Sequence, residues 1–309
     1  MSYHEFALID WIRQHVAGHD RLTTGIGDDA AVLRFPDPAE CLITTDMLMD
    51  GVDFRVGEAA PERIGRKALA VNLSDIAAMA GRPLAAVVAV ALPRRGGMEL
   101  GRGLHSGLQK LADEFGVALA GGDTNSWDGP LVISVTVLGE ATVRGAIRRS
   151  GAQVGDWIMV TGRLGGSLSG HHFDFTPRIA EALALHDSVA LHAMIDISDG
   201  LAADLEHILD ESCVGAVLDS AAIPISDAAL ATAVDGRSPL DHALGDGEDF
   251  ELLFTVSPDD GWKLLASPPF ATQITHIGEI VTGRACQLRA PDGSLVPLIA
   301  SGWRHWFES

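Results

Sequence analysis

Apolar residues recur at helical spacing in two stretches of the first half of the chain. Five of them are spaced by 4, 4, 3 and 4 positions: Leu100, Leu104, Leu108, Leu111 and Phe115. This spacing predicts a helix over 100–115, which Gly116 is placed to end. A second helix is predicted from Pro61, which suits a first turn, to Gly81. In that helix Asp75 is expected beside the apolar face.

Short apolar runs, several of them separated by helical segments, predict strands. They are residues 41–45, 85–92, 117–120, 131–139, 157–160, 193–197, 250–256 and 274–280. The alternation indicates a mixed α/β (α+β) fold. The polar, glycine-containing stretch RSGAQVGD over 149–156 separates a long strand from a new series of strands and helices. Since 309 residues exceed the usual single domain, we expect two domains, 1–147 and 148–309.

Composition narrows the class of protein. An apolar fraction of 47% argues against disorder, and 22 Lys and Arg against 42 Asp and Glu give a net charge of −20. Nucleic acids and anionic membranes would therefore be repelled. The longest strongly apolar stretch, 85–92, is too short to span a bilayer, and no basic n-region precedes an apolar run. The three cysteines are odd in number and far apart, so we expect a cytoplasmic protein without disulfides.

Acidic residues gather in short segments rich in small residues, expected in turns that follow strands or precede helices. The six segments are GIGDDAA (25–31), TTDML (44–48), NLSDIAAM (72–79), GGDT (121–124), DISDGLAADL (196–205) and GDGEDFELL (245–253). One such aspartate is most often a helix cap or a turn residue. Six together are typical of magnesium sites, because a hard cation takes oxygen ligands and is completed by substrate phosphates.

These segments favour phosphoryl chemistry that depends on metal ions. A carboxylate and a phosphate about 4 Å apart repel by roughly 4 kcal/mol at an effective dielectric near 20, and bridging cations reverse that sign. The chain has no GxxxxGK[ST] phosphate loop, no EF-hand register and no HExxH. The pair His171 and His172 lies in a glycine-rich segment, which favours a loop or surface role over metal ligation.

In this order along the chain, the acidic segments resemble those of the thiamine-monophosphate kinase family, of the aminoimidazole-ribonucleotide-synthetase-like superfamily. The matching segments are GIGDDAAV, TTDML, KALAVNLSDIAAM, GGDT, RRSGAQVGDWIMVTG, DISDGLAADLEHI and GEDFELLFT. The resemblance implies direct transfer of the γ-phosphate of ATP to thiamine monophosphate. It also implies a two-domain fold whose N-terminal strands pair with a second subunit, and hence a homodimer that binds ATP near the dimer interface.

The resemblance further implies roles for individual residues. Positions that hold several magnesium ions are Asp29, Thr44, Thr45, Asp46, Asp75, Asp123, Asp196 and Asp199. Positions that contact ATP are Gly122, Asp123, Arg149 and Ser198. Positions on the thiamine side are Asp53, Glu248 and Trp303. We expect Asp46, Asp75, Asp123 and Asp199 to be the catalytic carboxylates, with Asp46, Asp75 and Asp123 sharing ions. The family's GxHF reads GVDF at Asp53, and its LGDS turn reads LGGS at Gly166.

The sequence leaves two alternative functions open. The chain could be another ATP-using member of the superfamily, such as an aminoimidazole ribonucleotide synthetase; a selenophosphate synthetase is disfavoured because the first cysteine, Cys41, lies in a predicted strand. From a different class, it could be a catalytically silent, metal-binding interaction protein. Nucleotide binding with and without magnesium separates the last possibility from a kinase.

Overall fold

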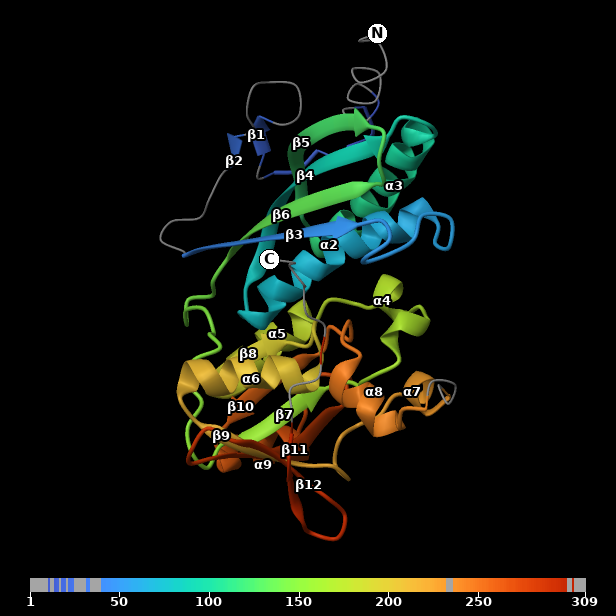
Figure 1. Ribbon diagram of the computed structural model, residues 1–309. Helices are drawn as coiled ribbons and strands as arrows, with labels where there is room; N and C mark the ends of the chain where they lie inside the picture. Colours follow the sequence, from blue (N-terminus) through green and yellow to red (C-terminus); the bar gives the residue numbers. More distant parts are fainter. Residues whose placement is uncertain are drawn as a thin grey trace. The chain divides into compact units, whose positions relative to one another are not determined.

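The structure is a computed structural model that describes residues 11, 14–16, 18–20, 22–24, 32–33, 40–231, 236–298 and 302. The chain divides into two compact units, one made of the residues up to Ile76 with Gly81–Gly145, the other of Ala77–Ala80 with the residues from Ala146 onward. Each unit combines a main sheet with helices, which confirms the mixed α/β expectation (Figure 1). Among the described residues, no helix combines the length and the apolar character needed to cross a membrane.

The first unit is built on a four-stranded sheet in the order β3-β6-β4-β5. Its elements are β1 (Leu22–Thr24), β2 (Val32–Leu33), β3 (Cys41–Met49), α2 (Pro61–Ala78), β4 (Arg82–Pro93), α3 (Gly97–Phe115), β5 (Ala118–Trp127) and β6 (Val132–Glu140). Strand β6 is antiparallel to both of its neighbours, whereas β4 and β5 are parallel and are joined through α3. A parallel pair requires such a crossover, and the order leaves β3 and β5 as the two edges of this sheet.

Both helices predicted from apolar spacing are present. Helix α3 buries Leu100, Leu104, Leu108 and Leu111, and it ends at Gly116, whose φ of 65° lies in the left-handed region that favours glycine. Helix α2 ends at Ala78, three residues earlier than expected. The reason is a reversal at Ala80, whose φ is 51°, so that the Gly81 N–H donates to the Ile76 carbonyl at 2.9 Å and closes the helix.

Two of the acidic segments, TTDML and GGDT, lie inside strands, which corrects the expectation that they form turns, whereas NLSDIAAM lies in the helix that was predicted to contain it. TTDML belongs to β3, NLSDIAAM to α2 and GGDT to β5. In strand β3, Thr44 and Asp46 lie half-buried on the same face as the buried Leu42 and Leu48, and the other face is exposed. Strand β5 continues past its apolar start through exposed residues, which an edge strand tolerates.

The second unit is built on a seven-stranded sheet in the order β13-β12-β9-β11-β7-β10-β8. Its elements are β7 (Trp157–Thr161), η1 (Ser167–Ser169), α4 (His171–Asp174), α5 (Ile179–Ser188), β8 (Leu191–Asp196), α6 (Leu201–Ser212), β9 (Gly215–Asp219), α7 (Asp227–Ala231), α8 (Pro239–Gly245), β10 (Leu252–Val256), α9 (Pro258–Ala266), β11 (Ile274–Val281), β12 (Cys286–Arg289) and β13 (Leu295–Pro297). All strand pairs of this sheet are antiparallel except β12 with β9. Its core packs α6 against β7, β8 and β10 and thereby fixes the loops at their ends.

Candidate functional site

In the first unit, strand β3 presents Thr44 and Asp46 on one face, because residues two apart along a strand point the same way. The Thr44 hydroxyl donates to a carboxylate oxygen of Asp75 on α2, which ties the helix to this strand. Thr45 points to the other face, where its hydroxyl donates to the Val135 carbonyl at 3.2 Å. The structure therefore joins Thr44 to Asp75, places Asp46 on the same strand face as Thr44, and places Thr45 on the opposite face.

Strand β5 carries Gly122 and Asp123 at the opposite edge of the same sheet. The strand is irregular here, and a Cβ on Gly122 would lie 1.8 Å from the Val88 carbonyl oxygen, so only glycine fits. A bulge beside exposed polar residues is a common way to present a backbone to a ligand. Asp123 is exposed on this edge.

Asp46 and Asp123 of one chain are too far apart to share an ion. The register runs from Asp46 through Val135 and Val88 to Gly122, which is three strand spacings. At 4.7–4.9 Å each, the two edges are about 14 Å apart. Magnesium binds its ligands at about 2.1 Å, so the expectation that Asp46, Asp75 and Asp123 share ions is wrong within a single chain.

Asp53 lies in the loop after β3, which a buried lysine holds in place. The Asp53 carboxylate accepts from the Met49 N–H at 2.6 Å, and its backbone carbonyl accepts from the Lys67 ammonium at 2.8 Å. Lys67 is on α2 and is fully buried. A buried ammonium needs such a partner, so Lys67 fixes the loop that presents Asp53.

In the second unit, the segment DISDG joins β8 to α6 and is organised by Asp204. Asp196 ends β8 and is buried, and the backbone N–H groups of Ser198, Asp199 and Gly200 each donate to one Asp204 oxygen at 3.0 Å. Burial, followed by the charges of Asp196 and Asp199, raises the pKa of Asp204 to about 8. Asp204 thus shapes the loop that carries the predicted metal and ATP positions.

The donor set of this loop fits magnesium. Ligand atoms of Asp199, Asp204 and His207 lie within 4.8 Å of one another. Carboxylate oxygens are the ligands that a hard cation takes, and a divalent cation would offset the charges of Asp196 and Asp199, which raise the pKa of Asp204 in addition to its burial. In the first unit, Thr44, Asp46 and Asp75 offer oxygen atoms of the same chemistry, with Thr44 bonded to Asp75 and Asp46 on the strand face of Thr44.

The segment GEDFE, residues 247–251, runs directly beside DISDG. The Glu248 N–H donates to the Ser198 carbonyl at 2.7 Å, and the Phe250 N–H donates to the Ile197 carbonyl at 2.8 Å. Glu248 and Phe250 have φ of 56° and 51°, a conformation that costs energy for residues with a side chain and often marks functional sites. The predicted thiamine-side residue Glu248 is therefore adjacent to the predicted ATP-side residue Ser198.

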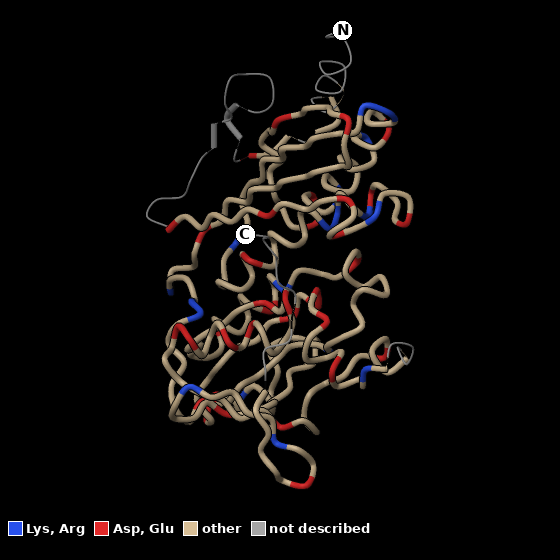
Figure 2. The backbone as a smooth tube through the Cα atoms, viewed as in Figure 1, with Lys and Arg blue, Asp and Glu red and all other residues tan. Residues whose placement is uncertain are grey.

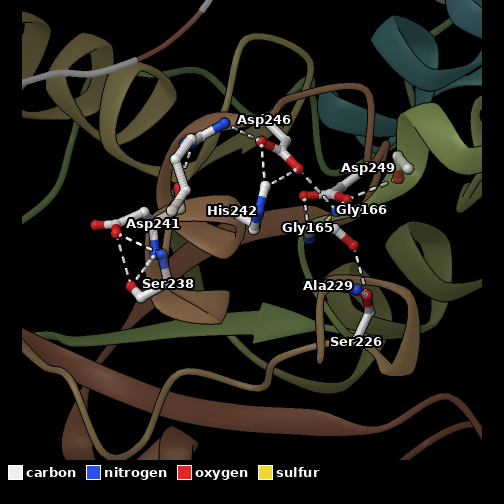
Figure 3. A network of polar contacts seen from close by, with 11 residues as sticks. Gly165, Gly166, Ser226, Ala229, Ser238, Asp241, His242, Asp246 and Asp249 are labelled. Atoms are coloured by element: carbon white, nitrogen blue, oxygen red, sulfur yellow. Dashed lines mark hydrogen bonds and ion pairs between the residues drawn. The ribbon is translucent and has the colours of Figure 1, made fainter. Parts of the chain in front are cut away.

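A polar network fixes the loop that leads from β7 to α4 against the same segment (Figure 3). The Asp249 carboxylate accepts from the Gly165 N–H at 2.9 Å and from the Ser167 hydroxyl at 2.7 Å. The Gly166 N–H donates to Asp246 at 3.0 Å. Gly166 has φ of 74°, and a Cβ there would lie 2.6 Å from the Ala229 nitrogen, so glycine suits this form of the turn where the family has an acid.

Asp249 gives a testable pH dependence. Burial raises its pKa to about 7, against 3.8 for the ordinary carboxyl. Between pH 4 and 7 the unfolded chain therefore binds fewer protons at this site, and the free energy of unfolding decreases as the pH rises, by at most about 1.4 kcal/mol per pH unit. Asp249→Asn keeps an acceptor oxygen but cannot titrate, so the variant should lose this slope.

Urea unfolding at several pH values between 5 and 7 measures the difference between the variant and the unmodified chain. Asp128→Asn, at a carboxylate that is 84% exposed, is the matched control and should leave the slope unchanged. Parallel curves for Asp249→Asn and the unmodified chain would contradict the assignment.

The remaining predictions for single residues concern the two histidines, Arg149, Asp29 and Trp303. His172 is buried in α4, with its Nδ1 3.0 Å from a Glu248 oxygen, so the loop or surface role expected for both histidines holds only for the exposed His171. The burial of His172 accompanies its contact with Glu248, and no local sequence pattern indicates that contact. Arg149 is exposed. Asp29 and Trp303 lie outside the described residues.

Four residues were not assigned functional roles from the sequence: Lys67 in the first unit and His172, Asp204 and Asp249 in the second. Asp204 and Asp249 stand inside two acidic segments that had been singled out, so proximity to the motif was an available signal. A lysine on an otherwise apolar helix face was a signal for Lys67, since such a residue must find a partner. His172 had no comparable signal.

Comparison with known proteins identifies the class of protein to which the two units correspond. Residues 27–141 match the AIR synthase related protein N-terminal domain, and residues 153–290 match the corresponding C-terminal domain. A thiamine-monophosphate kinase of Rhodopirellula baltica is 39% identical over 309 residues, covering 97% of both chains. The crystal structure of thiamine-monophosphate kinase from Stenotrophomonas maltophilia K279a is 37% identical, with a TM-score of 0.80 over 94% of this chain and 98% of that one.

A third relative was solved with ligands. It is described as AaThiL complexed with AMPPCP and TMP and is 29% identical, with a TM-score of 0.77 over 98% of this chain and 97% of that one. Both domain matches and the coverage of whole relatives agree with the order of motifs. The chain belongs to the thiamine-monophosphate kinase family.

Proposed function

We propose that this chain transfers the γ-phosphate of ATP to thiamine monophosphate, forming thiamine diphosphate and ADP. The observation that carries the proposal is the match to thiamine-monophosphate kinases over nearly the whole length of both chains. The complex of AaThiL with AMPPCP and TMP supports the pairing of this nucleotide class with this acceptor. The geometry agrees, because the 2.7 Å backbone bond between Glu248 and Ser198 keeps acceptor-side and ATP-side residues adjacent.

Within this reaction, the chain's own groups bind and orient the two substrates. Gly122 exposes backbone on β5, and Arg149 offers an exposed guanidinium, a group suited to phosphate. Glu248 supplies a negative charge for the permanently cationic thiazolium ring. We assign Trp303 and Asp53 to the same acceptor side, Trp303 through cation–π contact.

We also propose that magnesium is required. The residues that would hold the ions are Asp29, Thr44, Asp46, Asp75, Asp123, Asp196 and Asp199, with Thr45 contributing from the opposite face of β3. When bound, magnesium neutralises charge on the polyphosphate and on the transferred group. The contribution of the chain is to fix these oxygens, through the Thr44–Asp75 hydrogen bond and through the three N–H groups held by Asp204.

A homodimer is the assembly that we propose. Among the described residues, the four-stranded sheet ends in the edge strands β3 and β5, and the exposed face of β3 carries large apolar side chains, with Ile43 67% and Met47 62% exposed. Such a face and such edges favour a protein partner. The separation of Asp46 from Asp123 within one chain has a simple resolution if Asp123 of one copy meets Asp46 of the other.

The experiment that tests the function compares acceptors. Purified protein is incubated with ATP and magnesium together with one compound at a time: thiamine monophosphate, thiamine, or the ribonucleotide substrate of an aminoimidazole ribonucleotide synthetase. ADP and thiamine diphosphate should form in proportion to each other only when thiamine monophosphate is present. Turnover of the ribonucleotide would indicate another enzyme of the superfamily, and nucleotide binding without turnover of any acceptor would indicate a binding protein.

A further inference from the structure

His172 is held in a buried position that its neighbour does not share. It lies in α4, a helix of only four residues, and is 7% exposed, whereas the adjacent His171 is exposed. Its ring packs on Phe173 with centroids 4.0 Å apart, and its Nδ1 lies 3.0 Å from an oxygen of Glu248. Because a carboxylate only accepts hydrogen bonds, Nδ1 carries the proton in this contact.

The backbone around Glu248 is fixed independently of this contact. Glu248 is held at positive φ by the bond from its N–H to the Ser198 carbonyl, and Phe250, two residues later, stacks on Phe175 with ring centroids 4.0 Å apart. A residue in such a conformation persists only where its surroundings determine it fully. The backbone is thus set, while the direction of the Glu248 carboxylate depends on what its side chain contacts.

The segment that carries His172 is fixed to the segment that carries Glu248 at several further points. Residues 161–178 donate to every acidic residue between 246 and 251. Gly166 donates to Asp246, Gly165 and Ser167 donate to Asp249 (Figure 3), and Thr161 and Arg178 donate to Glu251. These contacts surround the His172–Glu248 pair on both sides in sequence, so the imidazole approaches a defined carboxylate oxygen from a rigid base.

We propose that His172 is a positioning residue, which orients the Glu248 carboxylate toward the thiazolium cation of the acceptor. The inference rests on the proposed function, in which Glu248 faces thiamine monophosphate. The carboxylate accepts the imidazole N–H, and this contact sets the direction in which the carboxylate meets the ligand. An imidazole does this without the permanent positive charge of lysine or arginine, which would compete with the cationic acceptor for the same carboxylate.

The test compares two replacements that differ in where they place an N–H donor. The amide of asparagine can occupy the place of Nδ1, whereas the longer glutamine places its amide near Nε2. His172→Gln should raise the KM for thiamine monophosphate about tenfold with the KM for ATP within twofold, since only acceptor binding loses an oriented carboxylate. His172→Asn should stay within about threefold of the unmodified enzyme for both substrates. His171→Gln is the matched control and should change neither constant.

Coupling to Glu248 separates positioning from a structural role. In a Glu248→Gln background, His172→Gln should add less than twofold to the KM for thiamine monophosphate, because the carboxylate that it orients is gone. Equal increases in both KM values, or an undiminished tenfold effect in the Glu248→Gln background, would overturn the proposal. If the glutamine variant does not fold, His172→Asn decides alone, and a tenfold rise of its acceptor KM would overturn the proposal.

Failure of the proposed function is recognised separately. If the unmodified enzyme does not phosphorylate thiamine monophosphate, the function itself is wrong. If it does, and His172→Gln leaves the acceptor KM unchanged, only the role of His172 is wrong. Protection from thermal unfolding by thiamine monophosphate alone is a second readout that needs no turnover, and the glutamine variant should require about tenfold more ligand for the same shift.

Discussion

Asp75→Asn is expected to lower kcat by two to three orders of magnitude while the melting temperature changes by no more than a few degrees. The substitution keeps an oxygen that can accept from the Thr44 hydroxyl, so the link between α2 and β3 survives. It removes a full negative charge from the set formed with Asp46, and loss of one such electrostatic contribution to a charged transition state typically costs this much. ADP release at saturating magnesium and thiamine monophosphate measures the effect.

The control for this variant is Asp113→Asn on α3, a carboxylate that is exposed and accepts from Gln109 at 2.7 Å. It removes the same charge and should leave kcat within about twofold. Near-normal turnover of Asp75→Asn at saturating magnesium would remove Asp75 from the site.

The second large effect that we expect is a recovery of activity when two inactive variants are expressed together. Asp46→Asn and Asp123→Asn should each be nearly inactive, and co-expression of the two should restore about a quarter of the activity of the unmodified enzyme. Random pairing makes half of the dimers mixed, and each mixed dimer has one site with both aspartates intact. The expectation follows from the edges β3 and β5, which keep these residues about 14 Å apart in one chain.

Asp46→Asn co-expressed with Asp75→Asn is the negative control. Both residues belong to the same side of the site, so every mixed dimer still has one defect in each site and activity should not return. Light scattering should give twice the 32.5 kDa mass of the chain. No recovery in the first pair, or a monomer with full activity, would contradict the shared site.

Regular elements with a strong apolar period could be predicted closely. The stripe from Leu100 to Leu111 fixes one face of α3, and the Gly116 ending follows from glycine's freedom at positive φ. Strand lengths were less predictable at polar ends. Strand β5 was expected to stop at Ala120 but continues to Trp127, because pairing with β4 satisfies its backbone whatever its side chains are.

The candidate site was predictable as a set of residue types but not as an arrangement. Carboxylates among small residues indicate a cation site, yet only the strand order shows that Asp123 and Asp46 occupy opposite edges. The same holds for His172, whose role depends on a contact with a residue 76 positions away. Periodicity and composition report local preference, and these contacts are not local.

The most direct test of the central claim follows the phosphoryl group. The protein is incubated with ATP labelled in its γ-phosphate, magnesium and thiamine monophosphate, and the label is located by separating protein, nucleotides and thiamine esters. Direct transfer predicts label in the terminal phosphate of thiamine diphosphate, one for each ADP formed, and none on the protein. Label released as inorganic phosphate, or label retained on the protein before it reaches the acceptor, would contradict this account.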